Sequence, residues 1–266
     1  IRDVERSRGL GDVYKRQVHM NRLLGNYGIG HVRYPTAGGG GKEFAQPMYV
    51  NSPYGISIAH NGNLTNSKVL SRELFHAEMR HLNTDSDSEV LLNIFAHELG
   101  KQRAILPSKK HFFKAVRKTH IRCQGAYAGV ALIPGCGIIG FRDPRGLRPL
   151  GIGERDGPTK KEYIIASENA SFSALGFKTL RDVEPGEAVY IDVDGNLHSE
   201  QCSESSQSTP CIFEYVYLAR PDAVIEEISV LKSRLRMGQK LGKKINSIYP
   251  NSKIDAVIPI PESSTS

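Results

Sequence analysis

Three short polar segments of this sequence carry the residue types needed to hold a free amino acid and to polarise its side-chain carbonyl. They are Arg33-Tyr-Pro-Thr36, His60-Asn-Gly-Asn-Leu64 and Asn83-Thr-Asp-Ser-Asp-Ser-Glu89. Arg33 offers a planar fork of donors that suits an α-carboxylate, and Asp87 offers an anion for an α-ammonium group. The Asn61 side-chain amide and the Gly62 backbone N–H can converge as an oxyanion hole, because glycine lets a backbone approach a ligand closely.

The Asn61-Gly62 pair and Asp87 also fit purely structural roles. Asn-Gly is the strongest short signal for a β-hairpin, so Asn61 and Gly62 fit a tight turn as well as an oxyanion hole. The Ser-Asp-Ser-Glu run at 86–89 has the form of a helix capping box, and an Asp in the first helical turn is favoured by the helix dipole alone. From spacing only, Asp87 fits helix capping better than substrate binding.

Apolar patterning shows which elements must position these segments. The short apolar runs before Arg33 and before Asn61 predict strands joined by tight turns, since Gly and Pro separate them. Two amphipathic helices are predicted, one at about 66–82 and one that starts at Ser86. Further strands are predicted at 127–134, 137–141, 163–167 and 188–192. Strands, two helices and strands again indicate an α+β fold in which helices cover stacked sheets.

In this order, the motifs resemble the glutamine amidotransferases with an N-terminal nucleophile. The resemblance rests on HVRYPTAG at 31–38, HNGNLTN at 60–66 and SDSE at 86–89. Two further runs, GFRDPRGLRPL at 140–150 and CIFEYVYLARPD at 211–222, are typical of the amidophosphoribosyltransferase family within that group. The similarity extends from about residue 24 to about residue 262. It implies a four-layer αββα sandwich, followed by the start of an α/β phosphoribosyltransferase domain.

The resemblance implies a role for each candidate residue. It places Arg33 and Thr36 at the carboxylate end of bound glutamine, Asp87 at the ammonium group, and Asn61 with Gly62 at the tetrahedral oxyanion. In the family, a Cys thiolate at the mature N-terminus attacks the glutamine amide and releases ammonia through a thioester. No Cys stands near the N-terminus of this sequence. We therefore expect the chain as written to be inactive as a glutaminase.

The second reaction of the family transfers the ammonia to phosphoribosyl pyrophosphate and gives 5-phosphoribosylamine, the first step of purine biosynthesis. The implied partners are L-glutamine, phosphoribosyl pyrophosphate and purine nucleotide feedback inhibitors, in a cytoplasmic homo-oligomer. Mg²⁺ is expected at the phosphoribosyl pyrophosphate site, outside this chain. The alternatives are a non-catalytic glutamine-binding regulatory module and another class II amidotransferase.

The chain divides into four predicted parts. Residues 1–17 lack apolar periodicity and are expected to be foreign or disordered sequence. Residues 18–200 are the predicted amidotransferase domain, with its N-terminal part missing, and 201–210 is a Ser-rich linker. Residues 211–266 are expected to begin a truncated phosphoribosyltransferase domain, with a strand at 211–217, a helix at 228–248 and a buried strand from Val257 onward. The apolar side of that helix, which is predicted to face inward, consists of Leu231, Leu235, Leu241, Ile245 and Ile248.

The cysteines and histidines predict no metal site in this chain. Cys123, Cys136, Cys202 and Cys211 form no CxxC pair, which argues against a zinc site or a disulfide scaffold and fits a reducing compartment. By the resemblance, Cys211 occupies the place of an iron–sulfur ligand of some family members, and a plain buried Cys is the alternative. The nine histidines lack metal-ligand spacing, and His31 and His60 are expected to be core or rim residues.

The net charge of +7 raises the possibility of a nucleic-acid partner. Residues 226–244 hold six basic side chains against two acidic ones: Lys232, Arg234, Arg236, Lys240, Lys243 and Lys244 against Glu226 and Glu227. No zinc-finger spacing or aromatic RNA-binding motif accompanies them, so a solvated helix face is predicted and no nucleic acid. No run approaches the roughly 18 apolar residues of a membrane span, so no membrane partner is predicted.

A polar cluster at 142–148 completes the candidate residues. It contains Arg142, Asp143, Arg145 and Arg148 around a Pro-Arg-Gly turn. Arg–Asp pairing across that turn is a sufficient structural explanation, and no catalytic role is predicted for these residues.

Overall fold

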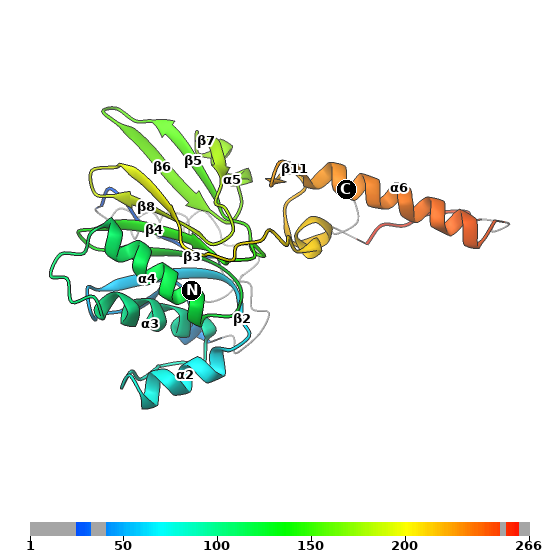
Figure 1. Ribbon diagram of the computed structural model, residues 1–266. Coiled ribbons are helices and arrows are strands. Elements are labelled where there is room, and N and C mark those ends of the chain that lie inside the picture. Colours follow the sequence, from blue (N-terminus) through cyan, green and yellow to red (C-terminus); the bar gives the residue numbers. More distant parts are fainter. Residues whose placement is uncertain (1–24, 33–40, 251–253, 261–266) are drawn as a thin grey trace, which may run out of the picture.

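The computed structural model describes residues 25–32, 41–250 and 254–260. Segment 1–17 and the predicted substrate-binding residues Arg33 and Thr36 therefore lie outside the described residues. The described chain contains two stacked antiparallel sheets, and helices cover the outer face of the larger one (Figure 1). This arrangement confirms the α+β class and the stacked sheets predicted from the sequence.

The larger sheet has six strands in the order β1-β2-β3-β4-β8-β9. Its strands are β1 (Met48–Val50), β2 (Ile56–Leu64), β3 (Gly125–Ile133), β4 (Gly137–Arg142), β8 (Glu187–Asp192) and β9 (Leu197–Gln201). Every neighbouring pair is antiparallel. The register of β2 on β3 runs from Ser57 opposite Leu132 to Leu64 opposite Gly125, so β2 is paired along almost its whole length.

The smaller sheet has three strands in the order β6-β5-β7. They are β5 (Gly151–Asp156), β6 (Lys161–Ala166) and β7 (Lys178–Asp182). Leu150, Ile152 and Val183 on this side pack against Ala128 and Val189 of the larger sheet, which forms the core between the sheets. The short helix α5 (Ala170–Ala174) lies against β7 (Figure 1).

Three helices lie on the other side of the larger sheet: α2 (Ser67–His76), α3 (Asp87–Gly100) and α4 (Lys109–Arg122). Helix α3 is the helix predicted to start at Ser86. The ring of Phe95 in α3 stacks on the ring of Phe141 in β4, with the ring centroids 5.9 Å apart. Helix α4 was not predicted, although its buried residues Phe112, Val116 and Thr119 recur at helical spacing among its basic side chains. It packs on α3 and contributes Phe112 and Val116, both fully buried, to the same core.

Helix α2 ends six residues before the predicted end at Leu82. Met79 has a left-handed φ of +51°, a conformation that an α-helix of L-residues does not contain. The Arg80 N–H then donates to the Leu74 carbonyl at 2.8 Å and closes the end of the helix. Leu82 still packs on the core, from the loop that follows.

The C-terminal part differs from the prediction in its first element. The strand predicted at 211–217 is wrong: Glu214–Leu218 forms a single π-helical turn, η2. Arg234 of the next helix donates to the carbonyls of Tyr215 and Ala219 at 2.9 and 2.8 Å, which satisfies backbone groups that a strand would pair in a sheet. A two-strand hairpin, β10 (Val224–Ile225) and β11 (Ile228–Ser229), leads into α6 (Val230–Ile248).

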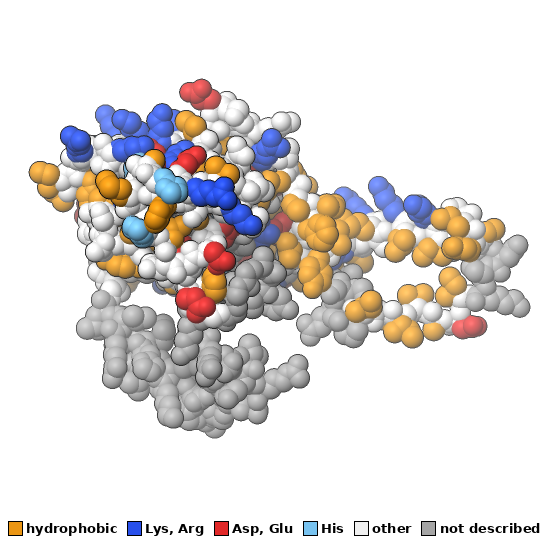
Figure 2. Space-filling model, turned by 90° about the horizontal axis from the view of Figure 1, so that it is seen from below, with side chains coloured by type: hydrophobic (Ala, Val, Ile, Leu, Met, Phe, Trp, Pro, Cys, Tyr) orange, Lys and Arg blue, Asp and Glu red, His pale blue; other side chains and the backbone are white. Residues whose placement is uncertain are grey.

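Helix α6 projects away from the sandwich (Figure 1). Of the residues predicted to face inward, Leu231, Leu235, Leu241 and Ile248 are exposed and Ile245 is half-buried, so that expectation was wrong. Figure 2 shows apolar side chains along this extension, with Lys and Arg gathered along one edge. Residues 254–260 form no strand either, because no neighbouring strand in the described chain pairs with their backbone.

Candidate active site

Strand β2 carries both residues predicted to form the oxyanion hole. Gly62 lies opposite Tyr127 of β3 and has a φ of +139°, in a region that residues with a side chain rarely adopt. A Cβ at this position would lie 2.0 Å from the carbonyl oxygen of Ala126, so glycine alone fits. The hairpin alternative for Asn61-Gly62 is therefore wrong, since the pair lies within a strand. Gly62 is exposed, which leaves its backbone accessible to a ligand.

The side chain of Asn61 has a defined orientation. Its Oδ1 accepts a hydrogen bond from Nη2 of Arg148 at 2.9 Å. A guanidinium only donates hydrogen bonds, so this contact determines which end of the amide is the oxygen. No described residue accepts a hydrogen bond from the Nδ2 of Asn61. The amide therefore presents a free N–H donor, which is the group that an oxyanion hole needs.

Asp87 lies at the N-terminus of α3, beside the end of β2. Its Oδ2 accepts a hydrogen bond from the Leu64 N–H at 2.9 Å, which ties the helix to the strand. The residue that caps α3 is Ser86, whose hydroxyl accepts from the Ser88 N–H. Asp87 is half-buried, and the structure gives its Oδ1 no partner among the described residues. This oxygen is therefore available to a cation such as an ammonium group.

Glu89 holds the loop that precedes Asp87. Its Oε1 accepts from the backbone N–H and the side-chain amide of Asn83, at 2.8 and 3.0 Å. Its Oε2 accepts from the N–H and the hydroxyl of Thr84, both at 2.7 Å. The capping box predicted from the sequence is thus wrong in detail, because Glu89 reaches past Ser86 to an earlier part of the chain. The result is a rigid loop next to Asp87.

His60 is a buried histidine of β2, as predicted, and His31 is half-buried. The Nδ1 of His60 lies 3.0 Å from the hydroxyl of Ser88, and its backbone N–H donates to Gln46 Oε1 at 2.7 Å. Burial lowers the pKa of His60 to about 4, although the charge of Asp87 opposes this shift. The imidazole is therefore neutral at pH 7 and contributes to the packing of β2 against α3.

The turn at 142–148 is organised by Asp143, but not through Arg–Asp pairing as predicted. The carboxylate of Asp143 accepts from the backbone N–H groups of Arg145, Leu147 and Arg148, at 2.9, 2.9 and 3.3 Å. It also accepts from the Tyr127 N–H at 3.3 Å, which fixes the turn on β3. Asp143 is fully buried. This network places the guanidinium of Arg148 against Asn61, a role that the sequence analysis missed.

The four cysteines are all free thiols. Cys123 and Cys202 are buried, and burial raises the pKa of each thiol to about 12. Burial also raises the pKa of Cys136. Because the thiolate is the reactive form, these three residues are poor nucleophiles near pH 7.

The described residues contain no group of three or more His, Cys, Asp or Glu side chains that could hold a metal ion. A search of the same residues found no helix with the length and apolar character to cross a membrane.

Comparison with known proteins decides the family. A model of the glutamine amidotransferase domain matches residues 39–174, which is more than half of the chain and includes Asn61, Gly62 and Asp87. The chain belongs to the glutamine amidotransferase family. Among its relatives are the amidophosphoribosyltransferases of Pseudomonas aeruginosa and Escherichia coli, 54% and 53% identical over 95% and 96% of this chain. The chain spans about half the length of these relatives, since the matches cover 50% of each.

Solved structures show the same relationship. The chain is similar to the glutamine phosphoribosylpyrophosphate amidotransferase from B. subtilis complexed with ADP and GMP, with a TM-score of 0.69 and 32% identity over 88% of this chain and 47% of that one. A second structure, described as the allosteric regulatory enzyme of purine biosynthesis, gives a TM-score of 0.68 and 34% identity over 88% and 46%. These matches confirm the predicted N-terminal-nucleophile hydrolase fold.

Proposed function

We propose that the protein to which this chain belongs releases ammonia from L-glutamine and transfers it to phosphoribosyl pyrophosphate, giving 5-phosphoribosylamine at the first step of purine biosynthesis. The observation that supports this most strongly is the end of β2, where a glycine-only backbone position follows Asn61, with its free amide donor. Asp87 lies beside the same strand end, bonded to Leu64. The acceptor substrate is inferred from the name of the relatives, amidophosphoribosyltransferase.

Each residue of the site has a proposed role in binding glutamine. Asn61 Nδ2 and the Gly62 N–H stabilise the oxyanion that forms when the amide carbon becomes tetrahedral. Removing one such donor typically lowers the rate roughly a hundred- to thousandfold. The free Oδ1 of Asp87 holds the α-ammonium group. Arg33 and Thr36 hold the α-carboxylate, as the family resemblance implies.

The first half-reaction transfers the γ-glutamyl acyl group of glutamine to a Cys thiol. A Cys thiolate adds to the amide carbon, the carbon–nitrogen bond breaks, and the nitrogen leaves as ammonia after it takes up a proton. Water then hydrolyses the thioester to glutamate and restores the thiol. Buried Cys123 and Cys202 do not suit this role, because burial raises the pKa of each thiol to about 12. The proposed nucleophile is instead the Cys at the mature N-terminus that the family uses.

The second half-reaction belongs to the region that follows the sandwich. We assign residues 18–200 to the amidotransferase domain, 201–210 to a linker and 211–266 to the beginning of the phosphoribosyltransferase domain. The family implies Mg²⁺ at the phosphoribosyl pyrophosphate site, and the described residues contain no group of three or more His, Cys, Asp or Glu side chains that could hold it. Regulation by purine nucleotides, a homo-oligomeric state and a cytoplasmic location complete the proposal.

The test compares two nitrogen donors in the protein expressed from its natural gene. Arg33→Ala and Asp87→Ala should abolish 5-phosphoribosylamine synthesis from glutamine and leave synthesis from free ammonia intact, because both side chains bind only glutamine. Asp85→Ala is the matched control: Asp85 is exposed, lies two residues from Asp87, and should keep both activities. If a folded Asp87→Ala protein lost both activities together, the assigned roles would be wrong.

A further inference from the structure

The guanidinium of Arg148 lies between the candidate active site and the C-terminal part of the chain. One of its nitrogens, Nη2, donates to Asn61 Oδ1 at 2.9 Å. The other, Nη1, lies 2.6 Å from Oε1 of Glu214, the first residue of η2. The side chain of Glu214 is only 5% exposed and that of Arg148 19% exposed, so this ion pair is largely shielded from water. The three residues are far apart in sequence and form one continuous chain of polar contacts, here called the Asn61–Arg148–Glu214 relay.

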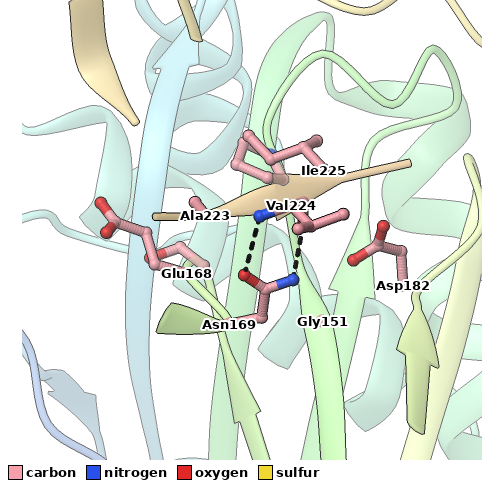
Figure 3. A pocket seen from close by; sticks show the side chains of 9 residues that line it. Gly151, Glu168, Asn169, Asp182, Ala223, Val224 and Ile225 are labelled. Carbon is pink, nitrogen blue, oxygen red and sulfur yellow. Dashed lines mark hydrogen bonds between the residues drawn. The ribbon is translucent and has the colours of Figure 1, made fainter. Parts of the chain in front are cut away.

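Glu214 belongs to a segment that other contacts already hold on the sandwich. The Glu226 N–H donates to Asp182 Oδ2 at 2.7 Å, and the Glu226 carboxylate pairs with Arg142 at 2.9 Å. The side-chain amide of Asn169 bonds both the N–H and the carbonyl of Val224 (Figure 3). Docking of the segment therefore rests on several contacts besides the Arg148–Glu214 pair.

We propose that Arg148 is a positioning residue for the oxyanion hole and that Glu214 orients it, so that the donor function of Asn61 depends on the docked C-terminal segment. This inference rests on the proposed function of the site and names two residues that act in it without touching the substrate.

The physical reason lies in the two faces of the Asn61 amide. A free amide can turn by half a rotation and present its oxygen to an oxyanion, where it repels instead of binding. The bond from Arg148 to Oδ1 prevents this, and its positive charge makes the opposite N–H a stronger donor. Arg148 in turn needs a fixed partner, since an arginine side chain has several flexible torsions. The buried carboxylate of Glu214 supplies that partner.

A double-mutant cycle separates this role from a general structural one. In the protein expressed from its natural gene, Arg148→Met should lower kcat for glutamine hydrolysis at least roughly tenfold. The loss should not exceed the roughly hundred- to thousandfold decrease that removal of one oxyanion donor typically causes. KM for glutamine and ammonia-dependent synthesis should stay near their original values. In an Asn61→Ala background, Arg148→Met should lower kcat less than about twofold further, because the group through which it acts is gone. Arg148→Lys replaces Arg148→Met if the latter does not fold.

Glu214→Gln tests the outer member of the relay. Glu227→Gln is its matched control, because Glu227 lies on the same docked segment and is exposed. Glu214→Gln should lower kcat for glutamine hydrolysis severalfold in the parent and less than twofold in the Asn61→Ala background, whereas Glu227→Gln should leave kcat unchanged. If the losses of kcat caused by Arg148→Met and Asn61→Ala multiply in the double variant, or if Glu214→Gln and Glu227→Gln have equal effects, the relay alone is overturned. An unsubstituted protein that hydrolyses no glutamine would overturn the proposed function and the relay with it.

Discussion

Replacing Gly62 by Ala tests the backbone geometry of β2 at the proposed oxyanion hole. The φ of +139° at Gly62 suits only glycine, and holding another residue in such a conformation costs on the order of 1–3 kcal/mol. The new Cβ would also lie 2.0 Å from the Ala126 oxygen and 2.9 Å from the Tyr127 Cα, both on the backbone of β3. Strand β3 cannot rotate away as a flexible side chain would, so β2 must shift.

The two penalties set the expected loss of stability. Overpacking of a fixed structure adds about 1–3 kcal/mol to the conformational strain, which gives a total of about 2–6 kcal/mol. For a domain of this size the thermal midpoint should fall by roughly 5–20 °C. A shift of β2 also moves the Gly62 N–H away from the oxyanion, so kcat for glutamine hydrolysis should fall roughly a hundredfold or more.

Gly135→Ala is the control that separates backbone strain at a positive φ from steric overlap of the new Cβ with neighbouring atoms. Gly135 also has a positive φ, +76°, but nothing lies within 4 Å of a Cβ placed there. The free energy of unfolding of this variant should fall by only about 1–3 kcal/mol, and the variant should keep full glutaminase activity. Thermal unfolding and the rate of glutamate release should be measured for both variants in the protein expressed from its natural gene. Equal midpoints for the two variants, together with unchanged glutamate release by Gly62→Ala, would refute the assigned geometry of β2.

Two further predictions concern buried ionisable side chains. His60 and His120 are neutral in the fold, because burial lowers the pKa of each to about 4 from an ordinary value of 6.5. The free energy of unfolding should fall as the pH drops from 6.5 to 4, by about 3 kcal/mol for each histidine, because over this range the unfolded chain takes up protons that the folded chain does not. Urea unfolding at pH 7 and pH 4.5 should show most of this loss, and a flat profile would contradict it. Glu89→Gln should weaken the anchoring of Asn83 and Thr84 and raise KM for glutamine roughly tenfold, with ammonia-dependent synthesis as the unaffected comparison.

Sequence patterns predicted the parts of the fold that local rules determine. Helix α3 combines a Ser86 cap with a nearly continuous apolar run, and strands β3, β4 and β8 combine apolar runs with Gly-rich turns. Helix α4 was missed although its buried residues Phe112, Val116 and Thr119 recur at helical spacing, because these few residues lie among many Lys, Arg and His side chains. The run at 211–217 was read as a strand because it is rich in aromatic and β-branched residues. Its backbone is instead satisfied by Arg234, from another element.

The candidate site was predictable only in part for the same reason. Asn61, Gly62 and Asp87 follow each other closely enough in sequence to form recognisable motifs. Arg148 is 87 positions from Asn61 in the chain, and the buried turn around Asp143 brings the two together. No local spacing marks such a contact. The same holds for Glu214, whose partner becomes evident only when the C-terminal segment is docked.

We propose that Asn61 and Gly62 bind the oxyanion of glutamine hydrolysis. A crystal structure can test this in the protein expressed from its natural gene, after reaction with a glutamine analogue whose side chain ends in an electrophilic ketone. The oxygen of the covalent adduct should lie about 2.7–3.1 Å from both Asn61 Nδ2 and the Gly62 nitrogen, with Asp87 on the ammonium group. An adduct whose oxygen faces away from β2, with the Asn61 amide turned so that Oδ1 leaves Arg148, would contradict it.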